Sequence, residues 1–166
     1  AASDVYKRQI EYGAVGNDHV LRKDGVHYFV VNNVGDVYNY QSVNKANTYY
    51  GYDAGNYDGT GGSNNAFGYE ALSDITTGSE NIAIGRSAGH KITTGVKNIC
   101  IGQQAGENIT DGASNTVIGV NAGDSLVSAD NNVILGRLAY QAGDNASNVV
   151  IGIQAGYANN GAEMFL

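Results

Sequence analysis

One 17-residue pattern recurs along most of this chain. Residues 81–97 read NIAIGRSAGHKITTGVK and residues 98–114 read NICIGQQAGENITDGAS, a match at a spacing of 17. Seven such units begin with asparagine; five of the six steps between them keep this spacing, and the last step is one residue shorter. These asparagines are Asn47, Asn64, Asn81, Asn98, Asn115, Asn132 and Asn148. Each unit must therefore be one small element that stacks on its neighbours.

We number the positions of each unit from its asparagine at position 1. Position 4 is large and apolar, position 5 is glycine, position 8 is alanine, and position 15 is glycine in four units. In the three most regular units these structural repeat residues are Asn81, Ile84, Gly85, Ala88, Gly95, Asn98, Ile101, Gly102, Ala105, Asn115, Ile118, Gly119 and Ala122. Seven copies in one register define the architecture.

The residues between the glycines predict short strands rather than helices. Glycine is a poor helix-interior residue, and the short β-branched runs suit strands joined by tight turns. At about 3.3 Å per residue, one unit makes a closed path of about 55 Å, and coils stack about 4.8 Å apart. The sequence predicts an all-β fold, a parallel β-solenoid (β-roll) of about seven 17-residue coils, on the order of 34 Å long.

Stacking places equivalent residues in columns along the solenoid. We expect the asparagines to form a side-chain amide ladder, as stacked asparagines do in other cross-β arrays. The glycine columns mark corners that need a positive φ or a close backbone approach. The alanine column marks a place where only a methyl group fits, so Ala105→Leu should overpack the interior.

The strand segment is apolar at both position 3 and position 4, which point to opposite faces. We expect position 4 to fill the coil interior and position 3 to point outward. A strand that is apolar on both faces is buried on both, so the outer face needs a partner. The predicted subunit interface is Ala83, Cys100, Val117, Ile134 and Val150. Alternatively, the N-terminal segment folds over this stripe.

The rest of the chain divides into short segments. We interpret residues 1–9 as a non-native leader, residues 10–46 as an N-terminal β cap or entry segment, residues 47–161 as the solenoid, and residues 162–166 as a truncated end. Residues 26–31 and 34–40 favour two strands of a β-hairpin or an irregular cap. A degenerate first coil is the alternative, because Gly35 lies nearly one repeat before Gly51.

Composition excludes some classes of function. The net charge of −7, with nine scattered Lys and Arg residues, argues against nucleic-acid binding. Cys100 is the single cysteine and is expected to be a small buried hydrophobe. The sequence contains no apolar run of about 18 residues, so it predicts no membrane-spanning helix. We predict no metal, no cofactor and no catalytic residues. His19, His27 and His90 are isolated, aspartates at the corners suit turns better than calcium, and no repeat column supplies a carboxylate pair.

Two sets of side chains are candidates for a ligand surface. A tyrosine cluster, represented by Tyr49, Tyr52, Tyr57 and Tyr69, combines aromatic faces with polar tips and suits glycans or protein partners. A threonine array at residues 76–77, 93–94 and 110 spans three coils and could order water or ice. The structural alternatives are packing at the entry to the solenoid for tyrosine, and strand formation beside a glycine corner for threonine.

The units show a family resemblance. The pattern N-x-x-I-G-x-x-A-G, as at Asn81, Ile84, Gly85, Ala88 and Gly89, resembles the head repeats of trimeric autotransporter adhesins (YadA-like heads). It is also similar to repeats of phage tail fibres and bacterial surface proteins. The resemblance covers about residues 47–160. It implies a left-handed roll, a homotrimer, a bacterial cell-surface or virion location, and adhesion to a host-cell receptor or glycan. Such fibres often carry a C-terminal self-cleaving chaperone. Adhesin head coils are usually shorter than the units of this chain, so the packing between copies can differ.

The sequence therefore predicts a non-enzymatic structural or adhesion module, the head or shaft of a trimeric fibre. The alternative is a monomeric β-solenoid that binds carbohydrate or ice through its tyrosine or threonine columns. An enzyme comes third.

Overall fold

A computed structural model describes residues 11–15, 18–23, 26–31, 37–38, 47–55 and 59–156 of the 166-residue chain. These residues form strands and turns and contain no helix. The chain divides into two compact units, Ala1–Thr48 and Tyr49–Leu166, which are described separately.

The N-terminal unit is an antiparallel meander. Strands β1 (Glu11–Val15), β2 (Asp18–Lys23), β3 (Val26–Val31) and β4 (Val37–Tyr38) pair in chain order. The pairing of β3 with β4 confirms the predicted hairpin, with a second strand shorter than expected. The first two strands extend the hairpin into a sheet that the sequence analysis did not predict. Gly35 and the proposed leader at 1–9 lie outside the described residues.

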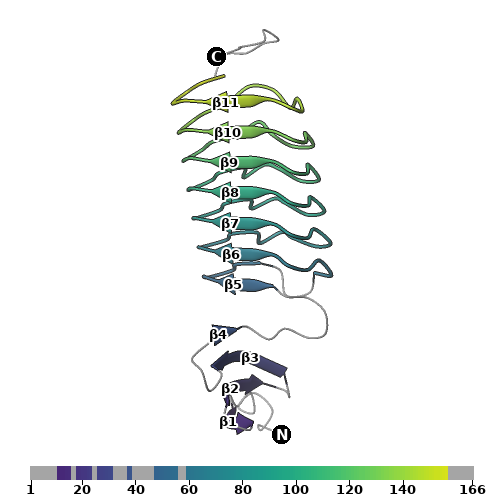
Figure 1. The fold of residues 1–166 in the computed structure, drawn as a ribbon, viewed down its shortest axis with the longest axis vertical. Helices are drawn as coiled ribbons and strands as arrows, with labels where there is room; N and C mark the ends of the chain where they lie inside the picture. The colour runs from purple at the N-terminus through teal and green to yellow at the C-terminus, as the bar shows by residue number, and fades with distance from the viewer. Residues whose placement is uncertain are drawn as a thin grey trace, which may run out of the picture. The chain divides into compact units, whose positions relative to one another are not determined.

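The second unit is a stack of short strands (Figure 1). They are β5 (Thr48–Tyr50), β6 (Asn65–Phe67), β7 (Ile82–Ile84), β8 (Ile99–Ile101), β9 (Thr116–Ile118), β10 (Val133–Leu135) and β11 (Val149–Ile151). They form one seven-stranded sheet in chain order, and β6 to β11 pair parallel. The predicted parallel β-solenoid is confirmed, with about six turns between seven strands. The left-handedness of the solenoid stays a prediction.

The repeat period is the pairing register. Ile82 pairs with Ile99, and Ile99 pairs with Thr116, each one repeat further along. Val133 pairs with Val149, so the shortened last unit loses its residue outside the strand. Backbone bonds follow the same step, as when Ile82 N donates to Asn98 O at 2.8 Å. Equivalent positions therefore lie above one another.

The asparagines form the predicted amide ladder inside the coil. Asn81 is fully buried, at 0% exposure. Its Nδ2 donates to Asn64 Oδ1 at 3.0 Å and to Gly95 O at 2.9 Å, and its backbone N donates to the same Asn64 Oδ1 at 3.0 Å. The pattern repeats at Asn98, Asn115 and Asn132. Each amide thus satisfies buried backbone groups of two coils.

The position-5 glycines form the predicted corners. Gly102 has φ +127°, a conformation that L side chains rarely adopt. A Cβ there would lie 2.7 Å from the carbonyl carbon and 2.7 Å from the oxygen of Gly119 in the next coil. Glycine is therefore required both by conformation and by the distance between coils.

The interior is narrow and filled by three apolar columns besides the asparagines. Position 8 supplies Ala88, Ala105 and Ala122, all at 0% exposure, as predicted. Position 12 supplies Ile75, Ile92, Ile109 and Leu126, which are also buried. The third column comes from the strands and fixes which strand face points inward.

Candidate functional site

Position 3 of each strand points into the coil, and positions 2 and 4 point outward. In β7, Ile82 is half-buried, Ala83 buried and Ile84 exposed. The sequence-based assignment of the two faces is therefore wrong. The predicted interface residues Ala83, Cys100, Val117 and Ile134 have 0% exposure, and Val150 packs against the core. Ile84, Ile101 and Ile118 lie on the outer face and do not fill the interior.

The buried asparagine explains this orientation. Positions 1 and 3 share one side of an extended chain, so position 3 points inward together with the asparagine. The position-3 column accommodates side chains from Ala83 and Cys100 to Ile134 and Tyr49, all of them buried. At position 4, by contrast, Phe67 is 42% exposed.

Cys100 is part of this interior. Its side chain is fully buried, and burial raises the pKa of the thiol to about 12. The neutral thiol therefore persists at any physiological pH, because a thiolate would lose its hydration. This agrees with the expectation of a small buried hydrophobe.

The outer strand face is an apolar stripe that runs along the whole sheet. Position 4 contributes Phe67 at 42% exposure, Ile84 at 43%, Ile118 at 38% and Ile151 at 55%. Position 2 adds half-buried Ile82, Ile99 and Val133 and the exposed Val149. We call positions 2 and 4 of strands β5 to β11 the outer stripe. Position 4 is apolar in every strand, whereas position 2 is polar at Thr48, Asn65 and Thr116, so the continuous apolar column of the outer stripe is position 4.

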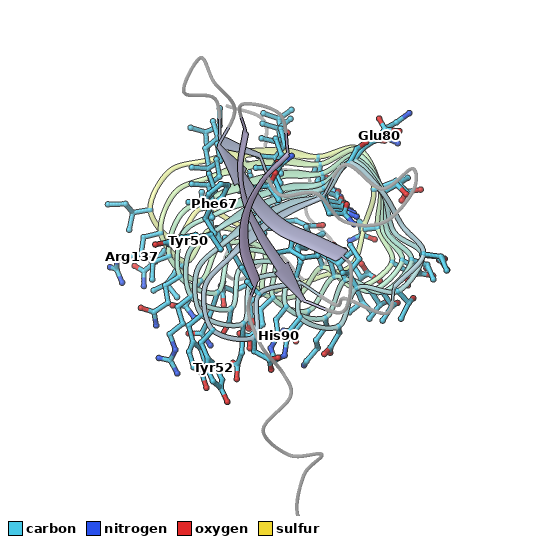
Figure 2. The ribbon with its side chains drawn as sticks, turned by 90° about the horizontal axis from the view of Figure 1, so that it is seen from below. Tyr50, Tyr52, Phe67, Glu80, His90 and Arg137 are labelled. Atoms are coloured by element: carbon cyan, nitrogen blue, oxygen red, sulfur yellow. The ribbon has the colours of Figure 1, made fainter. Side chains whose placement is uncertain are left out.

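An aromatic cluster lies at the β5–β6 end of the outer stripe. The rings of Tyr52 and Tyr69 at position 6 stack with centroids 5.4 Å apart and an interplanar angle of 12°. Tyr50 and Phe67 at position 4 form a tilted pair at 6.4 Å. The guanidinium carbon of Arg86, the next residue of the position-6 column, lies 6.0 Å from the Tyr69 centroid. Tyr52 projects from the coil (Figure 2), and Tyr50 and Tyr52 are 77% and 74% exposed.

The four tyrosines predicted to form a ligand surface do not lie together. Tyr52 and Tyr69 are brought together as an exposed stack. A hydrogen bond with Glu70, followed by the charge of Glu70, raises the pKa of Tyr69. Tyr49 is 8% exposed and belongs to the core, so its assignment to the surface is wrong. Tyr57 lies outside the described residues. Sequence reasoning left out Phe67, whose ring size was the available signal.

The threonine column bonds to the solenoid itself. The hydroxyl of Thr76 donates to Thr93 O at 3.0 Å, and that of Thr93 donates to Thr110 O at 3.2 Å. The Thr110 hydroxyl has two acceptors in reach, Asp111 Oδ1 at 3.0 Å and Val127 O at 3.3 Å. The hydroxyls of Thr76 and Thr93 are thus turned toward the backbone of the next coil, which supports the structural interpretation for these two residues over ordered water or ice.

Three successive backbone N–H groups at the threonine corner converge on one oxygen. The N–H groups of residues 76–78 all donate to Thr93 O, at 2.9, 3.2 and 3.1 Å. In the last such corner, Asp144 replaces that carbonyl, and its Oδ1 accepts from the N–H groups of residues 127–129 at 2.9, 3.1 and 2.9 Å. This carboxylate compensates for the shortened last unit, and it confirms a backbone-bonding role for this corner aspartate.

The side chain of His90 lies near two carboxylates. His90 Nε2 lies 3.8 Å from Asp74 Oδ1, and its Nδ1 lies 3.9 Å from Glu107 Oε1. Across the described part of the chain, no group of three or more His, Cys, Asp or Glu residues could hold a metal ion. Within the same ranges, no helix is long and apolar enough to cross a membrane.

Comparison with known proteins gives no relative. Neither a protein-family model, nor a curated protein, nor a solved structure matches the chain.

Proposed function

We propose that this chain is a non-enzymatic structural module, the head or shaft of a homotrimeric fibre that presents a receptor-binding surface. The observation that carries this proposal is the outer stripe, which is apolar at position 4 of all seven strands, on a solenoid whose own core is complete without it. A surface of this extent favours burial against another chain. The partner with a matching 17-residue period is a second copy of the same chain.

A trimer suits the stripe because a closed ring leaves no apolar face in water. Three narrow solenoids standing side by side can turn their stripes toward a common axis. The remaining faces, with exposed polar side chains such as Asp74, Lys91 and Asp111, then point outward. The family resemblance supports the same assembly and a cell-surface or virion location, with a host-cell receptor or glycan as ligand.

Sedimentation equilibrium of the purified chain tests this proposal. We expect three times the chain mass of 17.3 kDa. A mass of 17.3 kDa across micromolar concentrations, from a sample whose circular dichroism shows β structure, would contradict it.

The second candidate is a monomeric solenoid that binds carbohydrate through its aromatic cluster. The stacked pair of Tyr52 and Tyr69 favours it, because exposed aromatic rings with polar tips suit sugars. A glycan array would separate the two functions. Binding by a 17.3-kDa species that Tyr52→Ala abolishes and Thr93→Ala preserves would support the monomeric binder.

A further inference from the structure

Two asparagines of this chain stand in the acceptor motif for N-linked sugars, which is Asn-x-Ser/Thr with a residue other than proline in the middle. The first motif is NIT at residues 108–110, and the second is NAS at residues 145–147. An enzyme must reach the asparagine amide to attach a sugar, so the surroundings of each motif decide whether it can be used. The structure describes both motifs completely, and their surroundings differ.

The first motif is bonded into the solenoid at both ends. Asn108 is half-buried, and its Nδ2 donates to the carbonyl oxygen of Asp124 at 2.8 Å and to Asp124 Oδ1 at 2.9 Å. Its Oδ1 accepts from Lys91 Nζ at 2.7 Å. At the other end of the motif, the Thr110 carbonyl oxygen accepts from the N–H groups of residues 93–95 at 2.9, 3.2 and 3.1 Å. Neighbouring coils therefore occupy the groups that an enzyme would have to bind.

The second motif presents a free amide. The Asn145 side chain is exposed and makes no hydrogen bond within the described part of the chain. Its backbone is fixed, because its N–H donates to Tyr140 Oη at 3.3 Å and its carbonyl oxygen accepts from Asn148 Nδ2 at 2.9 Å. A Cβ at Gly143 would lie 3.1 Å from Asn145 Nδ2, so the glycine leaves room beside the amide.

The rest of the second motif is open as well. Residues 146 and 147 are exposed, and the Ser147 hydroxyl has no hydrogen-bond partner among the described residues. At this corner the carboxylate of Asp144 replaces the backbone carbonyl that binds the preceding coil elsewhere. Among the described contacts, the backbone of residues 145–147 is tied to the preceding coil through the Ser147 N–H alone, which donates to Asp130 O at 2.9 Å.

We propose that Asn145 is an acceptor site for an N-linked sugar and that Asn108 is not. In the transfer, Asn145 Nδ2 attacks the anomeric carbon of a sugar that is carried as a diphosphate ester. The new C–N bond forms, the bond from the anomeric carbon to the diphosphate oxygen breaks, the amide loses one proton, and the diphosphate ester leaves. The chain contributes the acceptor, and a glycosyltransferase that recognises the motif supplies the catalysis.

The sugar site does not depend on the proposed trimer. Asn145 occupies position 14 of its unit, the position of exposed Asp111, whose face the trimer would leave outward. The outer stripe consists of positions 2 and 4, so a sugar at position 14 adds polar surface outside it. Modification and association therefore do not compete.

Transfer in vitro compares the two sites in one protein. The folded full chain is incubated with UDP-glucose and a glycosyltransferase specific for Asn-x-Ser/Thr, and mass spectrometry of proteolytic peptides gives the rate of modification at each asparagine. Synthetic peptides of residues 104–113 and 141–150 give the rate at each motif without the fold. We expect the ratio of the folded-chain rate to the peptide rate to be at least about 10-fold higher at Asn145 than at Asn108, because Asn108 must first break its hydrogen bonds.

Two variants serve as controls. Asn145→Gln removes the acceptor, and Ser147→Ala removes the hydroxyl of the motif while it keeps the exposed amide and the backbone bond to Asp130. Both should lose modification at residue 145 and keep wild-type circular dichroism. Equal ratios at the two sites, a higher ratio at Asn108, or a sugar at residue 145 in Ser147→Ala would overturn the assignment. A wild-type chain that is modified at Asn145 and sediments as a monomer would contradict the trimer and support the sugar site.

Discussion

Removing one amide of the asparagine ladder should destabilise the solenoid far more than a surface substitution. In Asn98→Ala, Asn115 N and Asn115 Nδ2 lose Asn98 Oδ1, their acceptor at 3.0 Å. Gly112 O loses the Nδ2 donor at 2.7 Å, whereas Asn81 Oδ1 keeps the backbone N–H of residue 98 at 3.0 Å. Asn115 Nδ2 still donates to Ala129 O at 2.8 Å.

The substitution therefore leaves two buried backbone groups without a partner, Asn115 N–H and Gly112 C=O. Each buried orphan costs about 1–3 kcal/mol, so the free energy of unfolding should fall by about 2–6 kcal/mol. Denaturant titration followed by circular dichroism measures this loss. The control is Asn131→Gly, which changes an exposed asparagine with φ +60° and should change stability by less than about 0.5 kcal/mol. A loss below about 1 kcal/mol for Asn98→Ala would refute the role assigned to the ladder.

Three further predictions concern the corners and the interior. Gly102→Ala should lower the melting temperature nearly as much as Gly102→Val, because the first Cβ already lies 2.7 Å from the Gly119 carbonyl; a wild-type melting curve for Gly102→Ala would contradict this. Asp144→Ala should expose the C-terminal coils to faster amide exchange, since the N–H groups of residues 127–129 lose their acceptor; unchanged protection at these amides would count against it. Cys100 should resist iodoacetamide until the chain unfolds. Its folded pKa of about 12 exceeds the ordinary 9.0, so the stability it contributes is fully present below pH 9 and is lost as the pH rises toward 12. Comparison with Cys100→Ala over this pH range measures that loss.

Much of the fold could be predicted because the repeat constrains it many times over. The 17-residue period became the pairing register of Ile82 with Ile99, and the columns at positions 1, 5 and 8 became the ladder, corners and interior. Each of these residue types has a role that few other residues can fill. The asparagine amide hydrogen-bonds buried backbone groups of two coils, glycine adopts the positive φ of the corner, and alanine fits the narrow interior.

The facing of the strand could not be predicted from hydrophobicity, because Ala83 and Ile84 are both apolar. One signal in the sequence indicated the observed orientation. An asparagine ladder inside the coil fixes position 3 on the same side as position 1. Side-chain size does not separate the two faces in every unit, because Tyr49 is buried beside exposed Tyr50.

The N-terminal strands were harder to predict. β1 contains a glycine, and β2 has polar residues at both ends around two apolar ones. β1 is held by antiparallel pairing with β2, and β2 by antiparallel pairing with β3. Pairing of this kind depends on tertiary context more than on local preference. The aromatic cluster was half predicted, since Tyr52 and Tyr69 were chosen as surface residues while Tyr49 turned inward with position 3.

The most direct test of the outer stripe as a seam between copies is the mass of a variant that is charged on that stripe alone. Ile84 and Ile118 are exposed position-4 residues, so Ile84→Lys/Ile118→Lys leaves the coil interior intact. By sedimentation equilibrium, we predict 17.3 kDa for this variant, with wild-type circular dichroism, and three times that mass for the wild type. Equal masses for the two proteins would contradict the account.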